Sequence, residues 1–259
     1  MSIASLNYTQ SGEGPALLIV HGLFGSSRNW RTLGQQFAER FHVITVDLRN
    51  HGDSPHLDEM SYQAMAEDII ALLDRLQLSR VSIIGHSMGG KVAMKLCAGY
   101  PQRVSQLVVA DIGPVSYRHD YDDLIDAVLG LDLATVASRK QADEALSEGV
   151  PDARIRMFLL QNLVKVDSAM QWKLNWQSLK LNISQIIGFE DIGDWQIETP
   201  ALFVYGELSN YLNTEIRALI LQHFTQASFS AVANAGHWLH AEQPQQFYQV
   251  VNQFLLQDK

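Results

Sequence analysis

The chain has 259 residues, of which 47% are hydrophobic and 18% are charged, a composition that suits one large globular domain or a domain with an insertion. Its formal net charge of -9 argues against a nucleic-acid partner, because no basic stripe is present to displace counterions. The first long apolar run, Ala16–Val20, is too short for a membrane span and has no basic flank before it, so we expect a cytoplasmic protein.

The first elements predict one half of a sheet. Residues 3–8 alternate weakly between apolar and polar side chains, which predicts an edge strand, and a turn follows at 11–15. The continuous apolar run Ala16–Val20 is typical of a central strand in a parallel sheet, covered on both faces. It ends in the loop 21–27, whose glycines let backbone N–H groups come close to a ligand.

A helix at 30–37 and a second strand at 42–46 lead to a polar loop. We expect Asp47, Arg49 and His51 in that loop to hold it by hydrogen bonds rather than to touch a substrate.

An amphipathic helix is predicted over 62–76, where apolar residues recur at i, i+3 and i+4 after the N-cap Ser61.

The string Gly-His-Ser-Met-Gly at 85–89 carries the strongest signal in the chain. A β-branched run precedes it and a helical pattern follows at once, which predicts a strand, a sharp turn and a helix. The glycines let strand and helix approach closely around Ser87, whose backbone is strained. The hydroxyl then stands at a helix N-terminus, where exposed N–H groups favour developing negative charge.

Strands and helices alternate through most of the chain. Further buried strands are predicted at 106–110, 200–205 and 228–232, and a last helix at 243–256. The alternation indicates an α/β protein with a doubly wound, mostly parallel sheet and its functional groups at the carboxyl ends of the strands. Cys97, on the helix after Ser87, is expected to be a buried and inert thiol.

The alternation is interrupted between residues 114 and 198. Helical stripes, such as the one through 155–166, and an aromatic-rich stretch predict a helical cap (lid) inserted into a core of residues 1–113 and 199–259. Aromatic side chains in the cap and near the strand ends predict an apolar acyl pocket. The expected pocket residues are Phe24, Phe158, Trp172, Trp176 and Trp238.

Ser87 and a histidine after the last strand suggest nucleophilic catalysis. A serine hydroxyl is a poor nucleophile until an imidazole takes its proton, and the imidazole needs a carboxylate to fix its tautomer. We select His237 among the nine histidines because it follows a glycine directly after a strand end, which gives the chain order Ser, acid, His. His240, His86 and His21 are weaker candidates.

Several short strings together resemble the α/β-hydrolase superfamily. They are Gly-His-Ser-Met-Gly-Gly at 85–90, His-Gly at 21–22, Gly-Asp-Ser at 52–54 and Gly-His at 236–237. The longer strings at 21–26, 49–52, 89–91 and 236–238 are similar to its YbfF-type esterase branch, which is similar to the mammalian mitochondrial α/β-hydrolase domain-containing protein 11. The resemblance spans nearly the whole chain. It implies a Ser-acid-His hydrolase with a helical cap, which acts on carboxylic esters or acyl-CoA thioesters without a cofactor.

The chain departs from the superfamily pattern at the acid. The resemblance places an aspartate in a Gly-x-x-Asp string after the strand ending at Tyr205, but here that string ends in the neutral Ser209. Some members of the superfamily use the end of the neighbouring strand instead, which here is Asp111, and neighbouring strands are only about 4.8 Å apart. We therefore predict Asp111 as the acid, with Glu207 as the alternative.

Two backbone N–H groups are predicted to stabilise an oxyanion. Met88 follows the nucleophile directly, and Leu23 lies in the glycine-rich loop at 21–27, with Phe24 in reserve. Preorganised donors of this kind contribute about 3 to 4 kcal/mol each to transition-state stabilisation.

These residues predict a serine esterase with a Ser87-Asp111-His237 triad and an acyl-enzyme intermediate, needing neither cofactor nor metal. The substrate is a small-molecule ester or thioester, and the protein is a monomer or a small homo-oligomer. Between Pro114 and Thr199 there are 8 Lys/Arg and 14 Asp/Glu, so polyanionic coenzyme A meets repulsion there. Short or medium-chain esters are therefore ranked ahead of acyl-CoA.

Two alternatives remain open at this point. One is a carbon–carbon bond hydrolase or lyase on the same triad, although relatives that cleave vinylogous diketones tend to carry Asn where this chain has His86. The other is a non-catalytic ligand-binding protein on a hydrolase fold.

Overall fold

A seven-stranded sheet forms the centre of the computed structural model, which describes residues 2–119, 121–189 and 193–257. The strand order is β1-β3-β2-β4-β5-β8-β9; β1 runs antiparallel to β3 and the other neighbours are parallel. The strands are β1 (Tyr8–Ser11), β2 (Ala16–Val20), β3 (His42–Val46), β4 (Val81–His86), β5 (Val104–Ala110), β8 (Ala201–Gly206) and β9 (Ala227–Val232). The predicted α/β class with a mostly parallel sheet is confirmed.

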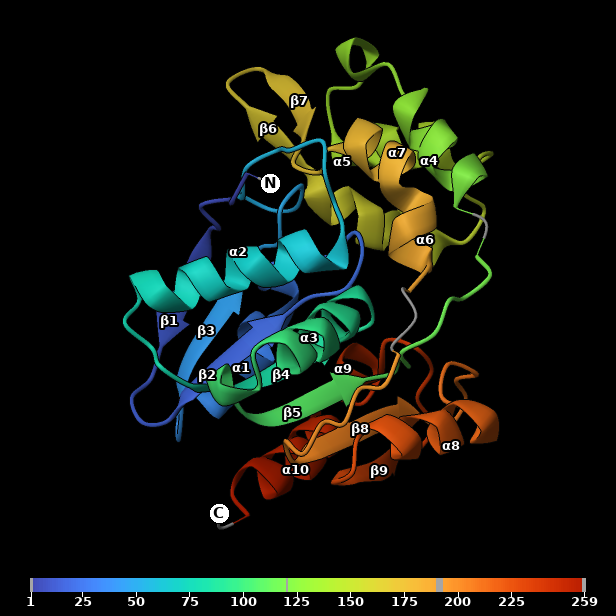
Figure 1. Cartoon of the computed structure of the whole chain (residues 1–259). Coiled ribbons are helices and arrows are strands. Elements are labelled where there is room, and N and C mark those ends of the chain that lie inside the picture. Colours follow the sequence, from blue (N-terminus) through green and yellow to red (C-terminus); the bar gives the residue numbers. More distant parts are fainter. Residues whose placement is uncertain (1, 120, 190–192, 258–259) are drawn as a thin grey trace.

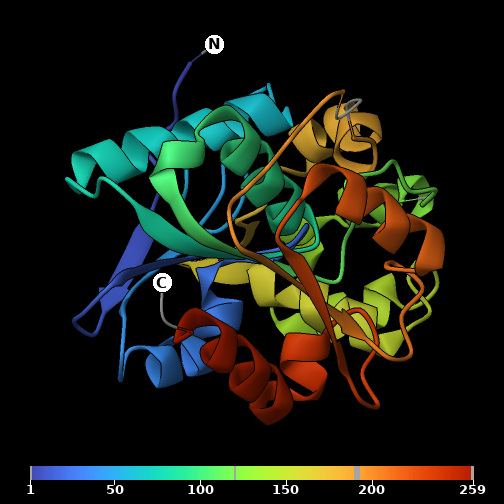
Figure 2. The same ribbon diagram turned by 60° about the horizontal axis from the view of Figure 1, so that its bottom comes forward.

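Helices cover both faces of this sheet, as Figures 1 and 2 show from two directions. The side chains of α2, α3 and α8 pack on one face, and those of α1, α9 and α10 on the other. Their bounds are α1 (Arg31–Phe37), α2 (Tyr62–Arg75), α3 (Met88–Gly99), α8 (Thr214–His223), α9 (Leu239–Glu242) and α10 (Pro244–Leu255). None of the helices in these described ranges has the length and hydrophobicity needed to cross a bilayer.

The central strand β2 shows why its sequence is continuously apolar. Leu18 and Val20 contact the helices on one face, whereas Leu17 and Ile19 contact those on the other, and all four are at most 1% exposed. Because successive side chains of a strand point to opposite faces, a strand covered on both faces needs apolar residues at every position. The predicted central strand is confirmed.

The predicted first strand starts five residues before the observed one and ends three residues before it. Strand β1 pairs Tyr8 with Val46 and Ser11 with Val43, so it shares only Tyr8 with the predicted strand and reaches the predicted turn only at Ser11. Residues before it run toward α2 instead, where the backbone N–H of Ala4 donates to the Asp68 carboxylate at 2.6 Å. Pairing with β3 thus outweighed the weak local alternation of residues 3–8.

An insertion between β5 and β8 gathers over one end of the sheet (Figure 1). Its elements are α4 (Asp122–Leu129), α5 (Arg139–Leu146), α6 (Ala153–Leu159), β6 (Leu163–Val166), β7 (Ala169–Trp172) and α7 (Trp176–Ile187). The hairpin β6–β7 was not predicted, because Leu163 and Val166 continue the apolar spacing of α6 although that helix ends at Leu159. Residues 114–198 form the proposed cap, which contains this hairpin as well as its helices.

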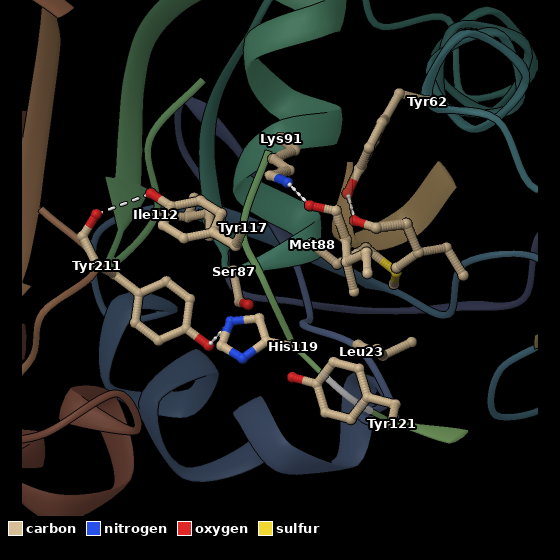
Figure 3. Close-up of a pocket in the computed structure, with 12 residues that line it drawn as sticks. Leu23, Tyr62, Ser87, Met88, Lys91, Ile112, Tyr117, His119, Tyr121 and Tyr211 are labelled. Carbon is tan, nitrogen blue, oxygen red and sulfur yellow. Dashed lines mark hydrogen bonds between the residues drawn. The ribbon is translucent and has the colours of Figure 1, made fainter. Parts of the chain in front are cut away.

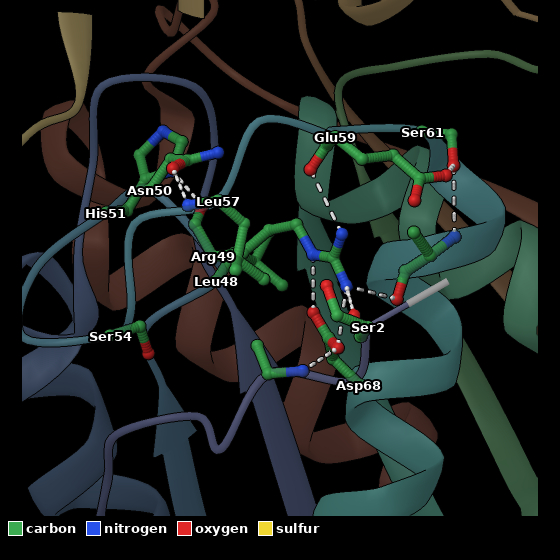
Figure 4. A network of polar contacts seen from close by, with 12 residues as sticks. Ser2, Leu48, Arg49, Asn50, His51, Ser54, Leu57, Glu59, Ser61 and Asp68 are labelled. Atoms are coloured by element: carbon green, nitrogen blue, oxygen red, sulfur yellow. Dashed lines mark hydrogen bonds and ion pairs between the residues drawn. The ribbon is translucent and has the colours of Figure 1, made fainter. Parts of the chain in front are cut away.

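A buried ion pair fastens the loop after β3 to α2 (Figure 4). The Arg49 guanidinium donates to both carboxylate oxygens of Asp68, at 2.7 and 2.8 Å, and the side chains are 1% and 0% exposed. In the same loop Asp47 accepts from the N–H of Ser27 at 2.7 Å, and the His51 ring accepts from the N–H of Phe24 at 3.3 Å. The predicted loop-holding role of these three side chains is confirmed.

Replacing Asp68 by alanine is expected to lower the free energy of unfolding by about 3 to 5 kcal/mol, because the Arg49 guanidinium is left buried and unpaired. The matched control is Asp74→Ala, which breaks a surface pair with Arg103, and it should cost at most about 1 kcal/mol because Asp74 is 62% exposed. Urea denaturation of both variants measures the difference. Equal losses would mean that the buried pair is not what stabilises this loop.

Candidate active site

Ser87 lies on a sharp turn between β4 and α3, as the sequence predicts. Its φ of 51° and ψ of -118° are unfavourable for a residue with a side chain, so the surrounding structure must hold them. A Cβ at Gly85 would lie 2.3 Å from the carbonyl oxygen of Gly89, and one at Gly89 would lie 2.4 Å from that of His21. Only glycine fits at these two positions, which explains the spacing of the string.

Ser87, His237 and Asp111 come together in one chain of hydrogen bonds. The His237 ring lies with Nε2 3.0 Å from Ser87 Oγ and Nδ1 2.8 Å from Asp111 Oδ2. Ser87 and Asp111 follow the adjacent parallel strands β4 and β5, and His237 lies in the loop after β9. In this geometry Nε2 can take the hydroxyl proton while the buried carboxylate stabilises the charged ring.

The carboxylate of Asp111 is held by two further donors. Ser209 Oγ donates to Oδ2 at 2.5 Å, and the backbone N–H of Gly206 donates to Oδ1 at 3.2 Å. Glu207, the alternative acid, instead accepts from the N–H of Asn234 at 3.0 Å and is exposed. The structure therefore places Asp111 rather than Glu207 beside His237, and Ser209 supports that carboxylate.

Two aromatic neighbours fix the position of the His237 residue. His86 Nε2 lies 2.9 Å from the carbonyl oxygen of His237 and donates to it. Burial lowers the pKa of His86, with its histidine neighbours adding to the effect, so this ring is neutral. The ring of Tyr211 stacks on the His237 imidazole with centroids 4.0 Å apart. The weaker histidine candidates His21 and His240 are also buried.

The predicted oxyanion donors lie beside Ser87. Leu23 and Met88 both line the cavity that contains Ser87. Among the backbone hydrogen bonds of turns and loops within residues 2–119, none is donated by the N–H of Leu23 or of Met88. The reserve candidate Phe24 differs, because its N–H donates to the His51 ring.

Tyrosine, histidine and lysine side chains form much of the cavity wall around Ser87 (Figure 3). The lining residues that the sequence did not predict are Tyr62, Lys91, Ile112, Tyr117, His119, Tyr121, Ile186, Ile187 and Tyr211. The Tyr211 hydroxyl lies 2.8 Å from His119 Nε2, and burial raises the pKa of Tyr211. The wall is thus more polar than an acyl pocket of tryptophan and phenylalanine.

The five predicted pocket residues lie outside the lining of this cavity. The rings of Phe158 and Trp238 contact each other, with centroids 5.6 Å apart. Both residues line a second hollow, which lies next to the cavity because Leu23 lines both. Phe24 packs against Trp176, which is 3% exposed and contacts Trp172 in turn. Aromatic residue type alone did not distinguish core packing from the cavity wall.

The described part of the chain shows neither a metal-binding cluster nor a reactive thiol beside this site. Within the described ranges, no group of three His, Cys, Asp or Glu side chains is arranged to hold a metal ion. Cys97 is buried on α3, and burial raises the pKa of its thiol to about 11, which fits the predicted inert thiol.

Comparisons with known proteins agree with this geometry. The family model described as alpha/beta hydrolase fold matches residues 15–244. The sn-1-specific diacylglycerol lipase ABHD11 of Mus musculus is 40% identical over an alignment of 249 residues, which covers 93% of this chain and 81% of that protein. Esterase YbfF of Escherichia coli (strain K12) is 35% identical over 240 residues, 92% of each chain. A solved structure titled "Marine microorganism esterase" is 39% identical and superposes with a TM-score of 0.93. The superposition covers 97% of this chain and 99% of the chain in that structure. The chain therefore belongs to the α/β-hydrolase fold family.

Proposed function

We propose that the protein is a serine esterase that cleaves carboxylic esters through Ser87, His237 and Asp111. The hydrogen-bond chain from Ser87 Oγ through His237 to Asp111 carries this proposal. The relatives named esterase and diacylglycerol lipase support ester bonds as the substrate class. The same chain of contacts argues against a binding protein without catalysis, which would not need a strained serine beside a histidine.

The reaction begins when Ser87 Oγ attacks the ester carbonyl carbon and His237 Nε2 takes its proton. The developing oxyanion accepts from the N–H groups of Leu23 and Met88. As the tetrahedral intermediate collapses, His237 returns the proton to the leaving alcohol and an acyl-Ser87 ester remains. Asp111 stays ionised and stabilises the imidazolium throughout.

Water completes the cycle by the same steps. His237 takes a proton from a water molecule, whose oxygen attacks the acyl carbon, and then gives the proton back to Ser87 Oγ as the acid leaves. The stacked ring of Tyr211 and the hydrogen bond from His86 hold His237 in place for both half-reactions.

A fluorophosphonate probe tests the nucleophile directly. The protein should gain one covalent adduct, and peptide mass spectrometry should locate it on Ser87, because only an activated hydroxyl attacks such a phosphorus centre. A burst of p-nitrophenol from p-nitrophenyl butyrate should accompany it. Absence of any adduct would overturn the covalent mechanism.

Esters are expected to be better substrates than thioesters of coenzyme A. The proposed cap between Pro114 and Thr199 carries 14 Asp/Glu against 8 Lys/Arg, so it repels a polyanionic leaving group. Raising the salt concentration should therefore raise kcat/KM for butyryl-CoA by several-fold or about tenfold, while p-nitrophenyl butyrate, which is neutral, changes little. Steady-state assays at two ionic strengths measure this. A thioester rate that falls with salt would contradict the expected repulsion.

A further inference from the structure

Lys91 lies beside the nucleophile, and the mechanism above does not use it. Its backbone N–H donates to the carbonyl oxygen of Ser87 at 3.1 Å, so it stands one helical turn beyond Ser87 on α3. Helix side chains lean toward the helix N-terminus, which directs the long side chain of Lys91 back toward the turn. Lys91 is 2% exposed and lines the same cavity as Ser87 (Figure 3).

The Lys91 ammonium group has more N–H donors than acceptors around it in the described ranges. It donates to the carbonyl oxygens of Ile187 and Gly188, at 3.0 and 2.7 Å, where α7 ends. The rings of Tyr62, Tyr117 and Phe189 surround it with centroids 5.1 to 5.6 Å away. An ammonium carries three N–H groups, and within the described ranges only these two carbonyls accept from it.

No carboxylate of the described ranges pairs with this cation. The ion pairs of the structure engage other lysines, and burial lowers the pKa of Lys91 to about 7. A buried charge is costly unless a partner of opposite sign accompanies it. An alkyl chain in the cavity would contact Leu23, Met88 and Ile112 without needing a cation in the wall. The missing partner is therefore best supplied by the substrate.

We propose that Lys91 binds a carboxylate at the far end of the substrate's acyl group, so that the preferred esters are monoesters of dicarboxylic acids. This inference rests on the proposed esterase function. The carboxylate accepts the third N–H of Lys91 in a charge-assisted hydrogen bond and supplies the opposite charge. The ester carbonyl meanwhile lies at Ser87, one helical turn away.

Matched methyl esters test the proposal. The monomethyl esters of succinic, glutaric and adipic acids are compared with methyl butyrate, pentanoate and hexanoate, and proton release is followed at constant pH. Lys91→Gln removes the charge but keeps a hydrogen-bond donor for the end of α7. For each pair, kcat/KM of the ester that carries a carboxylate is divided by kcat/KM of the neutral ester. We expect Lys91→Gln to lower this ratio by about tenfold or more in at least one pair.

Lys95→Gln is the matched control, because Lys95 lies one turn further along α3 and does not line the cavity with Ser87. It removes the same charge and should leave that ratio within about threefold, since a charge outside the cavity is screened. If Lys91→Gln lowers both esters of each pair equally, or if Lys95→Gln lowers the ratio as strongly, the carboxylate role is overturned. If the unmodified protein hydrolyses no ester at all, the esterase proposal itself fails.

A measurement on the unmodified protein does not depend on whether the Lys91 variant folds. Glutarate should inhibit hydrolysis of p-nitrophenyl butyrate competitively at about one tenth of the concentration that pentanoate requires, since only glutarate can reach Ser87 and Lys91 together. Equal inhibition by the two acids would overturn the proposal.

Discussion

Replacing Ser87 by alanine is expected to lower kcat for p-nitrophenyl butyrate by a factor of about 10⁶, the scale found when a serine hydrolase loses its nucleophile. Without Oγ no acyl-enzyme forms, and His237 Nε2 loses the partner that lies 3.0 Å away. The oxyanion donors and the cavity remain, so slow attack by water accounts for the residual rate. Steady-state rates and the loss of the fluorophosphonate adduct measure the effect.

A second serine of the same strand provides the control. Ser82 lies on β4 and its Oγ is 2.8 Å from Ser105 Oγ, far along the strand from the turn. Ser82→Ala should keep the adduct and a kcat within about twofold of the unmodified protein, because it changes only buried contacts with Ser105 and Gln106 that lie away from the turn. If Ser87→Ala retained a hundredth or more of the activity, another group would have to be the nucleophile.

The turn around Ser87 could be predicted because its requirements leave a short signature in the sequence. Gly85 is fixed by backbone atoms of Gly89 and Gly90, close to it in the chain, whereas Gly89 is fixed by backbone atoms at the end of β2, and both glycines lie within two residues of Ser87. His237 was found by a similar signal, since it follows a strand end. Asp111 needed one further step, the knowledge that β5 and β8 are neighbours.

The cavity wall could not be predicted from local patterns. Tyr62 comes from α2, His119 from the chain leaving β5, and Tyr211 from the segment after β8. Nothing in their local sequence distinguishes them from core residues, because only the folded sheet and the insertion bring these segments together. The aromatic residues chosen instead, such as Trp176, satisfy the same composition argument and pack in the core.

Lys91 and Ser209 were missed for a related reason. Lysine in the first turn of a helix is ordinarily solvated, and its burial here follows from three rings contributed by other segments. From the sequence alone, Ser209 is only a neutral residue that cannot replace a carboxylate. The structure gives it a use, since its hydroxyl donates to the carboxylate oxygen that also faces His237.

Replacing Asp111 by asparagine is expected to lower kcat by about 10⁴, whereas Glu207→Gln should change it by less than about twofold. An asparagine amide turned toward His237 Nδ1 donates a hydrogen bond where the carboxylate accepted one, so Nδ1 must act as an acceptor. The ring proton of the neutral imidazole then lies on Nε2, which can no longer accept the hydroxyl proton of Ser87. Glu207 contacts the N–H of Asn234 and not the histidine, so its charge is dispensable. The opposite ranking would refute the assignment of the acid.

Moving the carboxylate to residue 209 should then restore part of the kcat that Asp111→Asn loses. Ser209 Oγ lies 2.5 Å from the Asp111 oxygen that faces His237, so Ser209→Asp brings a carboxylate within reach of the same imidazole. In the Asp111→Asn background we expect kcat to rise about 10- to 100-fold over Asp111→Asn alone, while Ser209→Asn in that background gives no rise. Steady-state rates of the three variants decide this. A failure of Ser209→Asp to exceed Ser209→Asn would mean that the fixed position of the carboxylate at the end of β5, and not its charge near the ring, is what His237 requires.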